Sequence, residues 1–98
     1  MAIIQTIILP KNASPHGVRL SPDGSILYIA FMEGRAIGQM DTISHIVDII
    51  PVPGKAVQVA VTQDHRYVLA SLYDTKSIAR YDVITKNINI LQLPADTY

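Results

Sequence analysis

Hydrophobic residues in this chain come in short runs that alternate with turn-forming residues. The runs are rich in Ile, Val and Tyr, and Pro, Gly, Asp and Asn lie between them, which is typical of short β-strands. No stretch keeps an apolar helical period over several turns, so the pattern argues against helices. The predicted strands are residues 17–20, 26–32, 36–41, 46–52, 57–61, 67–72, 77–82 and 87–93.

The same pattern is present twice, in residues 18–53 and 59–94, at a spacing of 41 residues. The identical pairs are Val18/Val59, Asp23/Asp64, Ile37/Ile78, Asp41/Asp82, Ile43/Ile84, Ile49/Ile90 and Pro53/Pro94. A repeat of roughly 40–45 residues built from short strands is the signature of a β-propeller blade. A single blade is unable to bury both of its faces, so further blades must stack on it.

The predicted fold class is therefore all-β, with two four-stranded antiparallel propeller blades that belong to a larger or oligomer-completed propeller. Residues 11–53 are predicted to form the first blade and residues 54–98 the second. Residues 1–10 are predicted to be the outer strand of a neighbouring blade, because they resemble residues 46–53. Pro51 predicts that the last strand of a blade lies at its rim, since proline is confined to edge strands.

Several segments of the repeat also carry a recognisable motif. They are residues 15–30 (PHGVRLSPDGSILYIA), residues 37–42 (IGQMDT) and Pro53-Gly54. This motif resembles the YVTN-type β-propeller repeat, and the resemblance covers nearly the whole chain. The second copy departs further from the family, with Gln63-Asp64-His65 where the family has Pro-Asp-Gly.

The resemblance implies a fold more than a function, because one fold hosts many activities. Members of the family include surface-layer and periplasmic proteins, which implies a periplasmic or cell-surface location. Related propellers include lactonases, quinoprotein dehydrogenases and haem-bearing nitrite reductases. Complete relatives are usually single chains of about seven blades, so two blades depart from the family's monomeric architecture.

Composition adds an apolar excess and a balanced charge. Hydrophobic residues make up 49% of the chain and charged residues 16%, with eight basic and eight acidic side chains. A neutral chain has no long-range electrostatic field that attracts phosphates, so nucleic-acid binding is disfavoured.

There is no cysteine, and no apolar run is long enough to span a bilayer. Met1–Pro10 lacks the basic start of a signal peptide, so we expect a strand there.

The apolar excess predicts burial between subunits, or against blades that this chain does not contain. A propeller needs roughly four to eight blades, and cyclic assembly of two-blade chains is one way to reach that number. We expect the partner to be the chain itself, as a homotrimer or homotetramer. The alternative is that the missing blades belong to a longer chain.

Loops at one end of the blades are expected to share the channel face, where binding residues usually lie. The candidate ligand-binding residues are His16, Arg19, Glu33, Arg35, Tyr73, Asp74 and Lys76, with Lys11 and Lys55 nearby. An acid-x-base pattern recurs at 33–35 and 74–76. It predicts either a ring of alternating charge that holds a polar or zwitterionic ligand, or solvated loops with pairs worth at most about 1 kcal/mol.

His16 is the sharpest metal candidate, because a cyclic ring would bring one imidazole per chain near the axis. Three such imidazoles are a zinc-ligand set with an open position. The alternative is that His16 hydrogen-bonds a loop carbonyl and that the protein has no cofactor. If a metal is bound, we expect zinc or calcium. His45 and His65 are predicted to be solvated turn residues at the opposite end.

No catalytic motif is present: there is no G-x-S-x-G, His-Glu-x-x-His or phosphate-binding glycine loop. The sequence therefore favours a binding or scaffold propeller. The alternative is a metal- or cofactor-assisted enzyme whose site lies on the channel face around His16, with Arg19 and Arg35.

Overall fold

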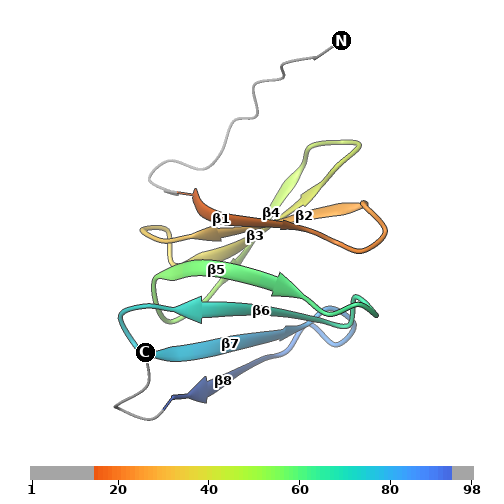
Figure 1. The fold of residues 1–98 in the computed structure, drawn as a ribbon. Helices are drawn as coiled ribbons and strands as arrows, with labels where there is room; N and C mark the ends of the chain where they lie inside the picture. Colours follow the sequence, from red (N-terminus) through yellow and green to blue (C-terminus); the bar gives the residue numbers. More distant parts are fainter. Residues whose placement is uncertain (1–14, 94–98) are drawn as a thin grey trace.

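The structure, a computed structural model, describes residues 15–93, which form two sheets (Figure 1). Blade 1 contains β1 (Pro15–Leu20), β2 (Ile26–Phe31), β3 (Ala36–Asp41) and β4 (Val47–Pro51). Blade 2 contains β5 (Ala56–Val61), β6 (Tyr67–Leu72), β7 (Ser77–Asp82) and β8 (Ile88–Gln92). All neighbouring strands are antiparallel. The predicted all-β class with two four-stranded antiparallel sheets is confirmed.

Within each blade the strands lie side by side in sequence order. Their observed limits differ from the predicted ones by at most two residues. β4, which ends at Pro51, is an edge strand, as predicted. Within residues 15–93 no helix is long and apolar enough to cross a membrane. The outer strand predicted at residues 1–10 lies outside the described residues, as does Lys11.

The first hairpin of each blade is closed by the repeated aspartate of the motif. The Asp23 carboxylate accepts hydrogen bonds from the Ser25 amide at 3.1 Å and from the Ser21 hydroxyl at 2.8 Å. These bonds lower the pKa of Asp23 to about 2, since they stabilise the charged form, the Ser21 hydroxyl most of all. The next residue is Gly24 in blade 1 and His65 in blade 2, both with positive φ (78° and 57°). Glycine adopts this conformation without strain, whereas histidine does not.

The turn after the third strand is built in the same way in both blades. The Asp41 carboxylate accepts the amides of Ile43 and Ser44, at 2.8 and 2.9 Å. Asp82 accepts the corresponding amides of blade 2, at 2.9 and 3.1 Å. Both aspartates therefore satisfy turn amides, and these amides lower the pKa of Asp41.

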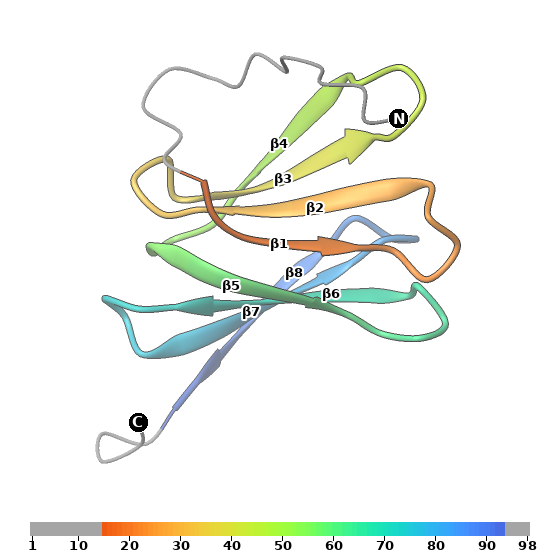
Figure 2. The same ribbon diagram turned by 45° about the horizontal axis from the view of Figure 1, so that its top comes forward.

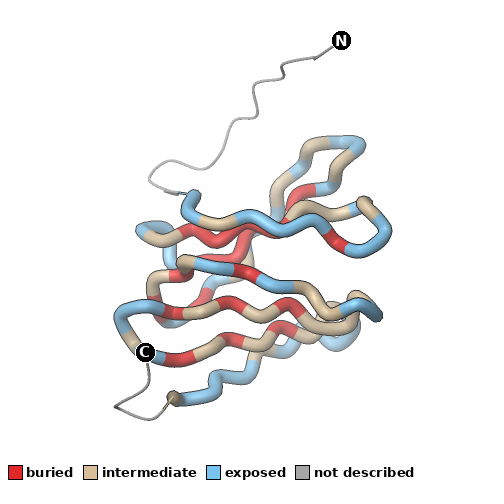
Figure 3. The backbone as a smooth tube through the Cα atoms, in the orientation of Figure 1, coloured by how far each residue is buried: buried red, intermediate tan, exposed pale blue. Residues whose placement is uncertain are grey.

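The main hydrophobic core lies between the blades, which pack face to face (Figure 2). Blade 1 and the connection after it contribute Tyr28, Ala30, Ile37 and Val52. Blade 2 contributes Ala56, Val59, Val68, Ala70, Leu72, Ala79 and Tyr81. Strand alternation explains this set, because residues two apart on a strand point to the same face. The buried segments therefore recur along the middle strands of both blades (Figure 3).

A second, smaller cluster covers the opposite face of blade 1. Ile29, Phe31 and Ala36 are buried there, with Leu27 packed against them. The Phe31 ring lies over Gly38, because a Cβ added at Gly38 would be 2.5 Å from Cε2 of that ring. At the equivalent positions blade 2 has Leu72 and Ala79. Blade 2 thus combines a smaller side chain, Leu72, with a methyl group on the neighbouring strand, that of Ala79.

Candidate functional site

One end of the two blades gathers the loops that carry most of the candidate residues. The β2–β3 loop, the β4–β5 connection, the β6–β7 loop and the start of β1 all lie at this end (Figure 2). We call it the loop end. β1 and β5 approach closely beside it, because a Cβ added at Gly17 would be 2.8 Å from the Val57 carbonyl oxygen. Gly17 therefore leaves the space that the neighbouring backbone fills.

Charged side chains at the loop end connect the two blades. Arg35 Nη1 of blade 1 lies 3.0 Å from Asp74 Oδ2 of blade 2. Asp74 Oδ1 also accepts the Lys55 backbone amide at 2.8 Å. These two contacts hold the pKa of Asp74 below its ordinary value, the amide more strongly than the guanidinium. Lys55 Nζ in turn lies 3.6 Å from Glu33 Oε2.

In the first loop the acid and the base of the pattern therefore pair with residues outside the loop. Arg35 contacts the acid of the next blade, and Glu33 contacts the connection between the blades. The loop around Tyr73 is held by its backbone amide, which donates to the Lys55 carbonyl at 2.9 Å, while the residue itself is 73% exposed. What the structure brings together is Glu33, Arg35, Lys55, Tyr73 and Asp74. In this arrangement the charges join blade 1 to blade 2.

His16 lies at the start of β1 with its Nδ1 atom 3.0 Å from the Val57 carbonyl oxygen. A carbonyl only accepts, so Nδ1 of His16 is the donor in this contact. Within residues 15–93 no three His, Cys, Asp or Glu side chains gather as a metal site. A metal at His16 therefore needs ligands from outside the described part of this chain.

Arg19 lies on the exposed side of β1, and its side chain reaches blade 2. It lines a hollow of about 270 Å³ with Gln58, Ala60, Ser71 and other blade 2 residues. Arg19 has no ion pair with any residue of the described range 15–93. Its repeat counterpart is Ala60, so only one blade of each chain presents this cation.

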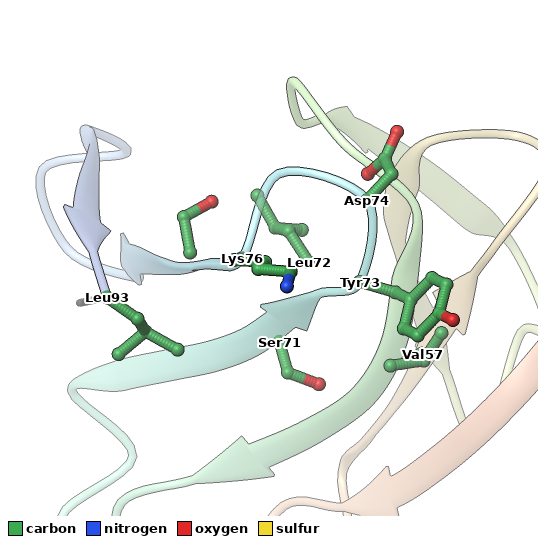
Figure 4. A pocket seen from close by; sticks show the side chains of 8 residues that line it. Val57, Ser71, Leu72, Tyr73, Asp74, Lys76 and Leu93 are labelled. Carbon is green, nitrogen blue, oxygen red and sulfur yellow. The ribbon is translucent and has the colours of Figure 1, made fainter. Parts of the chain in front are cut away.

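A larger hollow, of about 630 Å³, lies on blade 2 and contains three of the candidates (Figure 4). Its lining residues are Val57, Ser71, Leu72, Tyr73, Asp74, Lys76, Ser77 and Leu93. Leu93 follows β8 and Val57 lies in β5, on opposite sides of the hollow. By the alternation of β6, Ser71 faces away from Ala70 and Leu72, which pack toward blade 1. The hollow therefore opens on the side of blade 2 that blade 1 does not cover.

The prediction that His65 is merely solvated is wrong. Its Nε2 atom lies 2.7 Å from the Tyr28 hydroxyl, and the two rings meet edge to face at 81°. Tyr28 is fully buried, and this burial raises the pKa of its hydroxyl to about 12. The only sequence signal was the departure itself, a histidine in the turn position where the first repeat has glycine.

A second contact that the sequence did not indicate lies on the outward side of blade 2. The guanidinium groups of Arg66 and Arg80 lie 5.3 and 4.9 Å from the centre of the Tyr67 ring, within the range of cation–π attraction. Arg66 also binds Asp82 through two hydrogen bonds of 2.9 Å. The Nε atom of Arg80 is buried and has no hydrogen-bond partner in residues 15–93.

No protein-family model and no curated protein sequence matches this chain. Solved structures do match. Hydrazine synthase from Kuenenia stuttgartiensis has a TM-score of 0.80 at 22% identity, over 95% of this chain. Virginiamycin B lyase from Staphylococcus aureus has 0.77 at 18% over 88%, and the dihydro-heme d1 dehydrogenase NirN has 0.73 at 24% over 91%.

These neighbours are β-propeller proteins, and at such identities the likeness shows the fold alone. The chain spans only 27%, 29% and 19% of their respective lengths. That share agrees with a two-blade part of a propeller, and so do the two sheets stacked face to face. Residues 15–93 therefore fold as two adjacent blades of a partial β-propeller.

Proposed function

We propose that this chain is a non-enzymatic binding or scaffold module of the YVTN type, completed into a closed ring by further copies of itself. One observation carries the proposal: the outward faces of both blades leave large apolar side chains exposed. Val18 and Leu20 of blade 1 are 60% and 52% exposed, and Leu91 of blade 2 is 49% exposed. Side chains on a repeat face of this kind are normally covered by the next repeat.

The number of blades supports assembly from copies. Each chain supplies two blades, whereas closed propellers have roughly four to eight. A trimer would contain six blades and a tetramer eight, and head-to-tail contacts close into such rings when the rotation fits. A longer chain that carries the remaining blades is the other possible source, and the experiment below separates the two.

The contacts at the loop end support a scaffold or binding role over catalysis. Arg35 is engaged with Asp74 across the blades, and His16 is engaged with the Val57 carbonyl. These are two of the three polar groups on which an enzyme site around His16 would depend, and the third, Arg19, has no ion pair within residues 15–93. The contacts of Arg35 and His16 are explained by the need to hold neighbouring blades together.

The roles of the motif residues support the YVTN assignment. Ser21 and Asp23 of the motif close the first turn, and Asp41 closes the turn after β3. The corresponding residues of blade 2, Thr62 and Asp64, make the same kind of contact at 2.6 Å. Each blade therefore uses the motif for the same local purpose, as a repeat family requires.

Light scattering on the purified chain tests the proposal. We expect a solution mass three or four times the 10.8 kDa of one chain, with unfolding that shifts to higher temperature as protein concentration rises. A single-chain mass at micromolar concentration, with a cooperative and concentration-independent melt, would contradict self-completion.

A further inference from the structure

We propose that the outward face of blade 2 is the docking surface for blade 1 of a second copy, in the geometry that blade 2 has on blade 1 within one chain. This inference rests on the proposed function and names the surface, the direction and the contacts of the assembly. The occupant is a second copy because that chain presents the repeat equivalents of the residues already packed between the blades.

The contact inside the chain is the template. On blade 2, Val59 is 3% exposed and is packed in one cluster with Tyr28, Ala30 and Ile37 of blade 1. Ala56, fully buried, belongs to the same cluster as Val52. Blade 2 thus inserts two apolar side chains of β5, Ala56 and Val59, into a surface formed by β2, β3 and Val52.

The outward face of blade 2 reproduces the receiving surface of blade 1. The repeat counterparts of Tyr28, Ala30 and Ile37 are Leu69, Ser71 and Ile78. All three line the hollow of about 270 Å³, together with Ala60. The counterpart of Val52 is Leu93, which lines the hollow of about 630 Å³. Both hollows therefore lie where a further blade would pack, and Figure 4 shows the residues that line the larger one.

The outward face of blade 1 carries the matching side chains. Val18 is the counterpart of Val59 and is the same residue, yet it is 60% exposed. Pro15 is the counterpart of Ala56 and is also exposed. In the proposed contact Val18 enters the smaller hollow between Leu69 and Ile78, and Pro15 lies against Leu93.

Charges at the rim agree with this direction of packing. Within the chain, Arg35 of the receiving blade pairs with Asp74 of the inserted blade. The counterpart of Arg35 is Lys76, and the counterpart of Asp74 is Glu33. The cation therefore lies on blade 2 and the acid on blade 1, so head-to-tail packing of two copies brings opposite charges to the rim of the contact.

Head-to-tail contact predicts that two different surfaces must both be intact, unlike an isologous contact in which one surface meets itself. Val18→Glu blocks the inserted side and Ser71→Glu blocks the receiving side, since Ser71 lines both hollows. Neither change places a charge in the core of the single chain, because Val18 is exposed and Ser71 is half-buried on the outward face. Ile43→Glu is the matched control, an apolar residue 90% exposed in a turn outside both faces.

The masses of the wild type, the three variants and a mixture are measured by analytical ultracentrifugation, with circular dichroism to verify folding. We expect Ile43→Glu to assemble like the wild type and the other two variants to be single chains. An equimolar mixture of Val18→Glu and Ser71→Glu is expected to form a two-chain complex, since one intact contact remains and the ring is unable to close.

Three results would overturn the inference, and they differ in what else they affect. Val18→Glu and Ser71→Glu variants that both assemble fully would refute these surfaces and leave the proposed function standing. A mixture of the two that stays as single chains would refute the head-to-tail direction. A wild-type chain that is itself single would refute self-completion as well, and the two faces would then belong to blades of a longer chain.

Discussion

Identical residues at equivalent positions of the two blades have different surroundings in only part of the structure. Ile43 and Ile84 in the turns are both strongly exposed, at 90% and 70%, and Ile49 and Ile90 in the outer strands are exposed to 44% and 42%. In contrast, Val59 is 3% exposed and Val18 is 60% exposed.

Ile37 and Ile78 also differ in burial, but here the buried copy lies in blade 1 instead of blade 2. Ile37 of blade 1 is fully buried, whereas Ile78 of blade 2 is only half-buried. Among the identical apolar pairs, the large differences occur at Val18/Val59 and Ile37/Ile78, the pairs in which one copy faces the neighbouring blade and the other does not. Burial at these positions is therefore set by the presence of a neighbour and not by the residue or its strand.

The largest expected effect separates Ile37 from Ile78. Ile37→Ala is expected to lower the free energy of unfolding by about 2–5 kcal/mol, because it leaves a cavity between the blades. Ile78→Ala is expected to cost about 1 kcal/mol or less in the single chain, and more at higher protein concentration as copies cover it. Urea unfolding over a range of concentrations measures both. Equal losses at every concentration would show that the two faces are covered alike.

A second comparison concerns the aromatic cluster of blade 1. Gly38→Ala is expected to lower the free energy of unfolding by about 1–3 kcal/mol, since the new methyl group would overlap the Phe31 ring. The double variant with Phe31→Leu recreates the Leu72 and Ala79 combination of blade 2. Thermal melts are expected to show a smaller loss for the double variant than for the sum of the single ones. Simple additivity would exclude this coupling.

A smaller effect is expected where the Tyr28 hydroxyl of blade 1 contacts His65 in the turn of blade 2. Tyr28→Phe removes the contact with His65 and is expected to cost about 0.5–1.5 kcal/mol. Burial raises the pKa of the Tyr28 hydroxyl to about 12 in the folded state. The stability that Tyr28 contributes is therefore fully present below the unfolded pKa of about 10 and is lost as the pH rises toward 12. Thermal melts between neutral and alkaline pH are therefore expected to converge for wild type and variant. A constant difference across this range would contradict the assignment.

The smallest expected effect compares the turns after β3 and β7. Asp82 binds Arg66, whose repeat counterpart is Ser25, and this contact holds the pKa of Asp82 well below its ordinary value. A lowered pKa in the folded state stabilises the fold above the unfolded value near 4 and loses its contribution as the pH falls further. Arg66→Ser is expected to lower the melting temperature at neutral pH, with a difference that shrinks in acid. A difference that grows below pH 4 would contradict this sign.

The local features of the fold were predictable because they depend on neighbours in sequence. Alternating apolar residues and the turn aspartates Asp23 and Asp41 place each strand and hairpin to within two residues. The candidate site was only partly predictable. The repeated acid-x-base pattern does not say whether Arg35 pairs with Glu33 or with Asp74, because that choice depends on how the blades stack.

The His65 contact was missed for a related reason. Tyr28 and His65 lie 37 residues apart, on different blades, and no periodic pattern connects them. A histidine in a hairpin turn is ordinarily solvated, and only the stacked blade brings a buried hydroxyl within reach of its ring. The sequence marked the position solely by the loss of the turn glycine.

The sequence by itself determined the number of repeats, the strands within them and the turns that join them, since each of these is specified by residues close together in the chain. The tertiary structure alone decided that Val59 and Ile37 are covered while their identical counterparts Val18 and Ile78 are not. The physical reason is that a repeat blade has two apolar faces of nearly equal character, and the hydrophobic effect acts only where another surface removes water from them.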